Sequence, residues 1–173
     1  MELVTGILFV LAVAKYWISL DALRVLVLFS VLIPATLIDL KHKIIPDKLN
    51  LAGFILGLPF IFVTREVFFS GAIGFFVGGG LLLLIAVLSR GGMGGGDIKL
   101  AAVMGLLLGW KYLLVALFLA FLAGGIIGTL MFLLRIKKMK EAVPFGPYLA
   151  LGAIIAALEG DKIISWYIGF LGL

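Results

Sequence analysis

Residues 67–89 read VFFSGAIGFFVGGGLLLLIAVLS, and none of their side chains is charged. Roughly 20 apolar residues in a helix span the hydrocarbon core of a bilayer. A soluble domain usually has charge on about a quarter of its residues, whereas only 13% of this chain is charged and 64% is hydrophobic. The stretch therefore predicts a transmembrane helix, and the composition extends that prediction to the whole chain.

Further apolar segments lie on both sides of this helix. They are expected at about 2–20, 22–40, 48–64, 97–110, 112–135 and 144–158, followed by an apolar tail at about 163–173. The tail could be a half-span, an interfacial helix or a short last span. The first segment has no basic residues before it, which favours a retained helix over a signal peptide. We predict one all-α domain, residues 1–173, folded as a polytopic transmembrane bundle of six to eight spans.

The formal net charge is +5, and the basic residues gather in short loops between apolar segments. This distribution is typical of membrane flanks, where the loops contact lipid headgroups, and no nucleic-acid partner is expected. The positive-inside rule places three basic loops in the cytoplasm. Their residues are Lys41, His42, Lys43 and Lys48; Arg90 and Lys99; and Arg135, Lys137, Lys138 and Lys140.

Asp39 ends the second expected span and Asp97 begins the fifth, so alternating topology puts both at one membrane face. Ionisable groups at membrane depth are costly and suggest function. Two close carboxylates do not both ionise easily. The ionised one could take a proton from water while the protonated one polarises a scissile carbonyl. Asp39 and Asp97 are therefore the candidate catalytic pair.

Other interpretations of the two aspartates are open. Asp97 could be an ordinary helix N-cap, and Asp39 could simply pair with Lys41 and Lys43. Both could also bind a cation in a small ion-coupled transporter. Transporter sites usually lie near the midplane between repeated halves, whereas these residues lie near one face and the sequence shows no repeat.

Glycines have two expected uses. Those at 78–80 and 124–125 lie inside apolar segments and predict close helix packing. The run GGMGGG at 91–96 directly precedes Asp97. It lacks the Lys and Ser/Thr of a phosphate-binding loop. We expect a flexible loop in which Gly94 and Gly96 let the backbone approach a peptide substrate.

Prolines flank Asp39 in the sequence, and two more open the seventh segment. Pro46, followed by Asp47, ends the second segment because a residue before proline favours extended backbone. Pro144, Gly146 and Pro147 open the seventh segment. They could break the helix beside the aspartates and shape a substrate site, or simply start a helix with proline in its first turn. A proline within the second segment could also kink that helix.

The chain has one histidine, His42, and no cysteine, so a metal site built on these ligands is not expected. His42 lies in a basic loop, which favours a solvated side chain.

Three motifs resemble one family. Asp39 with Ile45-Pro46-Asp47 resembles the D…(I/L)P(D/N) segment of type IV prepilin peptidases and archaeal preflagellin peptidases. Gly94-Gly95-Gly96-Asp97 resembles the GxGD signature of these membrane aspartic proteases. Residues 144–152, PFGPYLALG, resemble the PFGPxLALG block of the bacterial branch. The resemblance covers about residues 30–155.

The resemblance implies that Asp39 and Asp97 are catalytic and that no cofactor is needed. It implies cleavage of short basic leaders from pilin-like, pseudopilin-like or flagellin-like precursors at the cytoplasmic face of the inner membrane. Asp47 is a candidate for leader recognition because few acidic groups lie at that face. Many bacterial relatives also have a cytoplasmic domain with paired CxxC motifs and N-methylate the product. Here the link near residues 15–21 is short and cysteine is absent, so a peptidase-only form is expected.

Overall fold

The computed structural model describes residues 2–90, 92–134 and 144–170. Within them the chain forms seven helices and no strand, which confirms the predicted all-α bundle. The helices are α1 (Glu2–Tyr16), α2 (Leu20–His42), α3 (Asp47–Ile61), α4 (Arg65–Leu88), α5 (Gly95–Leu108), α6 (Trp110–Leu133) and α7 (Gly146–Phe170). The predicted basic loop at 135–140, and Gly91 of the glycine run, lie outside the described residues.

Helix ends follow local chemistry. The Ser19 hydroxyl accepts the Ala22 N–H and caps the start of α2. At the other end, Lys43 adopts a left-handed conformation with φ of 55°, and its N–H donates to the Asp39 carbonyl. Helix α2 contains Pro34 without being interrupted by it. The second span therefore ends at its C-cap, one turn beyond Asp39.

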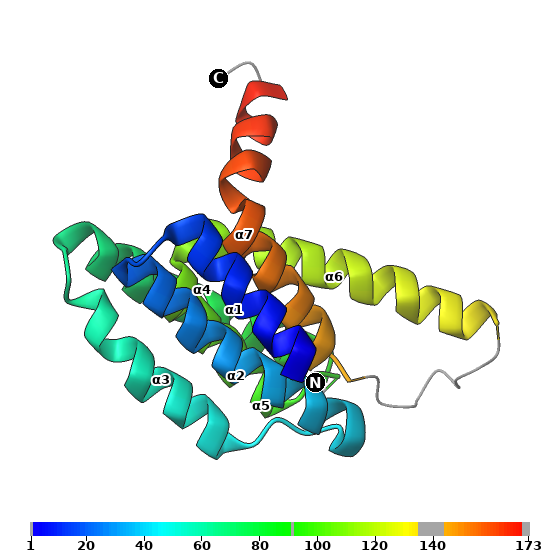
Figure 1. Cartoon of the computed structure of the whole chain (residues 1–173). Coiled ribbons are helices and arrows are strands. Elements are labelled where there is room, and N and C mark those ends of the chain that lie inside the picture. The colour runs from blue at the N-terminus through cyan, green and yellow to red at the C-terminus, as the bar shows by residue number, and fades with distance from the viewer. Residues whose placement is uncertain (1, 91, 135–143, 171–173) are drawn as a thin grey trace.

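The short helix α5 lies at the centre of the bundle, among the other helices in Figure 1. Every residue from Leu100 to Leu108 is buried. Helices α4 and α5 pack backbone to backbone: a Cβ on Gly74 would lie 2.3 Å from the Gly105 carbonyl oxygen, and one on Gly78 would lie 2.4 Å from that of Ala101. This packing fixes the position of the α5 start, and with it Asp97.

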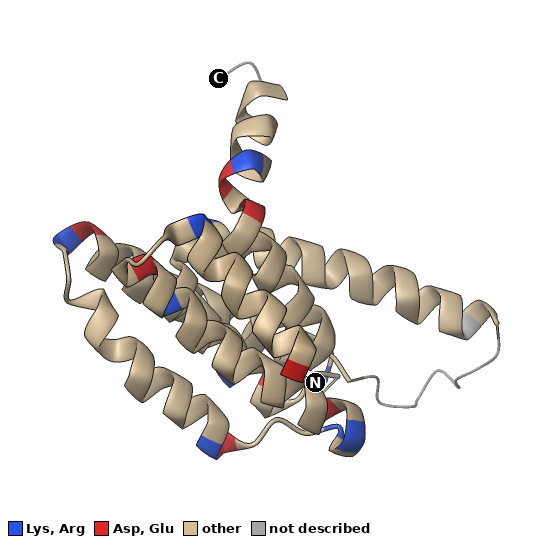
Figure 2. Ribbon diagram, viewed as in Figure 1, with Lys and Arg blue, Asp and Glu red and all other residues tan. Residues whose placement is uncertain are grey.

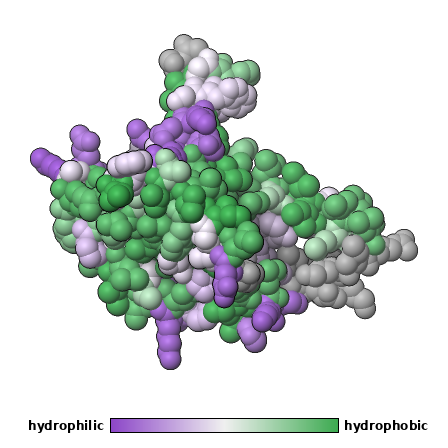
Figure 3. Space-filling view, viewed as in Figure 1, coloured by the Kyte–Doolittle hydropathy of each residue, from purple (hydrophilic) through white to green (hydrophobic). Residues whose placement is uncertain are grey.

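Charged residues gather at the two ends of the bundle in Figure 2, and Figure 3 shows an apolar surface between them. Among the described residues, three helices are long and apolar enough to cross a membrane: Leu20–His42, Arg65–Leu88 and Trp110–Met131. The chain is thus a multi-pass membrane protein, as predicted. The shorter helices, of 14 or 15 residues, complete the bundle around these three.

The predicted boundary near residue 158 was wrong. Helix α7 continues to Phe170 and projects beyond the other helices (Figure 1). The charged residues that suggested a loop are accommodated on the helix, since Lys162 forms an ion pair with Glu159 one turn earlier at 2.7 Å. Residues 171–173 of the expected tail lie outside the described residues.

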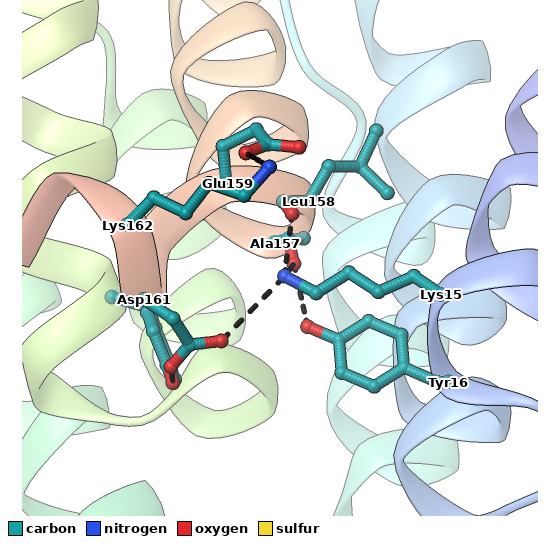
Figure 4. A network of polar contacts seen from close by, with 8 residues as sticks. Lys15, Tyr16, Ala157, Leu158, Glu159, Asp161 and Lys162 are labelled. Atoms are coloured by element: carbon teal, nitrogen blue, oxygen red, sulfur yellow. Dashed lines mark hydrogen bonds and ion pairs between the residues drawn. The ribbon is translucent and has the colours of Figure 1, made fainter.

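A polar network joins three helices where α1 ends (Figure 4). The Lys15 ammonium and the Tyr16 hydroxyl of α1 both donate to the Ala157 carbonyl of α7, at 3.3 and 2.5 Å. Asp161 accepts a hydrogen bond from Tyr112 of α6 and lies 3.6 Å from the Lys15 ammonium. We call these residues the α1–α6–α7 clamp. Ala157 and Asp161 lie about 16 and 22 Å along α7 from its first residue, at 1.5 Å per residue.

Candidate active site

Asp39 lies in the last turn of α2 and is only 4% exposed. Its Oδ2 accepts a hydrogen bond of 2.8 Å from the backbone N–H of Gly146, the first residue of α7. A buried carboxylate is costly unless donors surround it. The hydrogen bond from α7 satisfies one oxygen of the Asp39 carboxylate. Asp39 therefore does not need an ion pair with Lys41 or Lys43 to be accommodated in the interior.

Asp97 is the third residue of α5, and its own N–H donates to the Gly94 carbonyl at 3.1 Å. The N-cap is Gly94, so the ordinary N-cap interpretation of Asp97 was wrong. Its Oδ1 is buried and has no hydrogen-bond partner among the described residues. Asp39 lies close enough for its charge to act on Asp97. The fold thus brings the two carboxyl groups into one electrostatic environment.

Two glycines of the run have distinct positions. A Cβ on Gly94 would lie 3.1 Å from Oδ2 of Asp97, so a side chain there would crowd the carboxylate. A Cβ on Gly96 would lie 2.7 Å from the Ile45 carbonyl oxygen. The α5 start is therefore packed directly against the segment that follows Asp39. The predicted flexible loop is shorter than expected, because α5 already begins at Gly95.

Sequence reasoning missed Asn50. This residue, the only asparagine of the chain, is 4% exposed on α3. Its Nδ2 donates to the Gly96 carbonyl at 3.1 Å, one residue before Asp97. Its Oδ1 has no partner in the described part of the chain. The sequence did hold one signal for this residue, a single amide side chain at the start of an apolar helix. Because buried polar groups need hydrogen-bond partners, such an amide is expected to bind another segment.

Pro46 and Asp47 begin α3 at the same end of the bundle. Pro46 is the N-cap, with φ of −63° and ψ of 136°, and its carbonyl accepts the Leu49 N–H at 3.1 Å. Asp47 and Lys99 of α5 form an exposed ion pair of 2.7 Å. Asp47 therefore lies at the same end of the bundle as the site, with its carboxylate paired to Lys99 at the surface.

The proline block opens α7 beside Asp39. Pro144 and Phe145 precede the helix, while Gly146 and Pro147 lie in its first turn. A helix start with proline in the first turn is therefore observed, and Gly146 also binds the carboxylate. A Cβ on Gly146 would lie 2.8 Å from Oδ2 of Asp39. Only glycine permits this approach without a shift.

Two carboxyl groups held in this way suit proton transfer. One accepts a backbone N–H, and the other has an oxygen without a donor. Water held between them could lose a proton to one carboxylate while the other donates to a carbonyl. No group of three or more His, Asp and Glu side chains gathers into a metal site among the described residues.

Comparison with known proteins adds a family match. The sequence model of the "Type IV leader peptidase family" matches residues 26–129, which include Asp39 and Asp97 but not the α7 block. No solved structure matches.

Several curated proteins are similar over nearly the whole chain. Each of the following is named "Prepilin leader peptidase/N-methyltransferase". The Bacillus subtilis protein is 38% identical over 96% of this chain and 68% of its own length. The Legionella pneumophila protein is 34% identical over 98% of this chain and 61% of its own length. The Pseudomonas aeruginosa protein is 34% identical over 99% of this chain and 61% of its own length. The chain thus spans 61 to 68% of the length of these relatives.

Proposed function

The chain belongs to the type IV leader peptidase family, and on that premise we propose that it is an aspartic endopeptidase acting on prepilin-like precursors. The observation that supports the proposal is that Asp39 and Asp97 lie at the same end of the bundle, within the matched residues, with the start of α5 packed against the segment that follows Asp39. Neither the family match nor the named relatives support the cation-transport alternative.

We assign different roles to the two carboxyl groups. Asp39 is the ionised group, because its Oδ2 accepts the Gly146 N–H. Asp97 holds the proton, because its Oδ1 lacks a donor among the described residues. Asp39 takes a proton from water as the water oxygen bonds to the scissile carbonyl carbon, and Asp97 protonates the carbonyl oxygen. When the tetrahedral diol collapses, the C–N bond breaks and the departing amine takes the proton from Asp39. One diol hydroxyl returns its proton to Asp97 as the C=O bond re-forms, which restores both carboxyl groups.

The proposed substrates are membrane-inserted precursors with a short basic leader before an apolar helix. We place the reaction at the cytoplasmic face of the inner membrane, since the aspartates share an end of the bundle with Lys41, Lys43 and Lys48. Asp47 is proposed to attract the leader. The relatives' names include methyltransferase; the proposal for this chain concerns the peptidase reaction.

The test compares the wild type with Asp39→Asn and Asp97→Asn in lipid vesicles with a prepilin-like precursor. A single cut between leader and apolar helix is expected from the wild type, and its loss from both variants. Thermal unfolding would show whether each variant remains folded. Undiminished cleavage by either folded variant would remove that residue from the mechanism.

A further inference from the structure

An apolar groove of about 760 Å³ lies between α3, α4 and α5. Phe54 of α3 and Phe75 and Phe76 of α4 line it. Gly79 and Gly80 also line it, and a Cβ on Gly80 would meet no atom within 4 Å. The groove is therefore open where α4 lacks side chains.

The residues that line the groove are charged at one end and apolar along the rest. Its charged residues are Asp47 and Lys48, at the start of α3, and Lys99, in the second turn of α5. Beyond the first turn of α3 its lining is apolar, and Phe54 lies seven residues after Asp47, about 10 Å along the helix. Along α3 the groove thus spans about two helical turns, from its charged end to its apolar body.

The charged end is continuous with the candidate site. Ile98, which lines the groove, directly follows Asp97. Asn50 lines the groove too, and donates to the carbonyl of Gly96. Its Oδ1 is buried and has no donor among the described residues. Asn50 therefore connects the groove wall to the start of α5, directly before Asp97. A chain segment passing from the groove toward the aspartates would meet Asn50 at the boundary.

We propose that this groove receives the apolar helix of the membrane-inserted precursor, with the preceding polar segment crossing the charged end toward Asp97. The proposal rests on the proposed function. A substrate that changes from charged to apolar along its sequence matches the same change along the groove. Binding the helix on α3 and α4 would fix the register of the peptide bond at the aspartates.

Photo-crosslinking tests the groove directly. Phe76 in the groove and Phe118 on α6 are 74% and 67% exposed, and only the first lines the groove. Each is replaced by p-benzoylphenylalanine in the Asp97→Asn background, which keeps the precursor intact. The probe is a synthetic precursor with a basic leader, a glycine and an apolar helix, inserted in vesicles. We expect several times more precursor adduct at position 76. Equal yields at both positions, or lipid adducts alone at 76, would overturn the proposal.

A second experiment places a side chain in the groove. Gly80→Leu adds a side chain to the lining, and Gly125→Leu on α6 is the matched control, because neither Cβ would meet an atom within 4 Å. We expect KM to rise about tenfold in Gly80→Leu with kcat close to wild type, at the scale of one side chain in an apolar pocket. An unchanged KM would contradict the proposal. If the wild type cleaves no precursor, the proposed function fails, while the crosslinking yields still decide whether the groove binds the helix.

Discussion

Gly146 lies so close to the carboxyl of Asp39 that no side chain fits between them. Its N–H donates to Oδ2 at 2.8 Å, and an added Cβ would lie 2.8 Å from the same oxygen. In Gly146→Ala the carboxyl must move although the donor remains. A displacement of about 1 Å can reduce turnover by roughly 100-fold, so we expect kcat to fall at least tenfold while the protein stays folded.

The control for Gly146→Ala is Gly125→Ala, where an added Cβ meets nothing within 4 Å. Steady-state cleavage of a prepilin-like precursor gives kcat, and thermal unfolding reports the fold. A kcat for Gly146→Ala equal to that of the control would show that the bond from α7 does not position Asp39.

Asp47 allows a separate test of leader recognition. Its carboxylate is exposed and paired with Lys99, an arrangement that is worth little for stability. Asp47→Asn should raise KM for a basic leader by about two- to fivefold, the scale of one exposed charge pair, with kcat retained. Lys99→Gln breaks the same pair but leaves the Asp47 charge available, so its KM should not rise. Loss of turnover at saturating substrate in Asp47→Asn would assign the residue to chemistry instead.

Asp39, Asp97 and Asp47 could be proposed as candidates from the sequence because charge is rare in this chain and the motifs surround them. Asn50 could not, since its function depends on which carbonyl its amide reaches. That partner is 46 residues away on another helix. Pairing across helices depends on rotation about the helix axis, and an apolar segment with little amphipathic pattern does not predict that rotation.

At the scale of the helix, close approach of α4 and α5 depends on a few glycines. A Cβ on Gly74 would lie 2.3 Å from a backbone oxygen of Gly105, which cannot rotate away. Gly74→Ala should therefore separate the helices and lower the free energy of unfolding by about 1–3 kcal/mol, the usual cost of overpacking. Denaturation in detergent would measure this change.

Gly80→Ala on the same helix is the control for Gly74→Ala. Its Cβ would meet nothing within 4 Å, and alanine favours a helix over glycine by up to about 1 kcal/mol. Opposite effects on the unfolding midpoint are expected. Equal destabilisation would mean that backbone contact between α4 and α5 does not limit stability.

The sequence predicted the helices more reliably than the contacts between them. The apolar runs predicted seven helical segments because long uncharged stretches in lipid must satisfy their backbone internally. The prediction that glycines 78–80 pack closely holds for Gly78, whereas Gly80 lines an open groove. The charged residues near 160 suggested a helix end, but contacts with α1 and α6 accommodate them within α7.

For the molecule as a whole, charged residues gather at two ends separated by apolar helices (Figure 2). One end holds Asp39, Asp97 and Asn50, which join α2, α3, α5 and α7. The other holds the α1–α6–α7 clamp. Polar side chains within a bilayer stabilise helix association modestly, by about 0.6 kcal/mol on average. The two ends should therefore contribute to stability alike but differ in their effect on catalysis.

The clamp gives the last prediction. Tyr112→Phe removes the hydroxyl that Asp161 accepts from but keeps the ring that packs on Gly160. Asp161 still lies near the Lys15 ammonium, so its charge is not left alone. We expect the free energy of unfolding to fall by about 1 kcal/mol, with kcat and KM both unchanged because the aspartates lie at the other end. Unfolding in detergent and cleavage kinetics on the same preparation would measure both. A drop in kcat without loss of stability would show that the clamp controls the geometry of the active site through α7, which carries both Gly146 and Asp161.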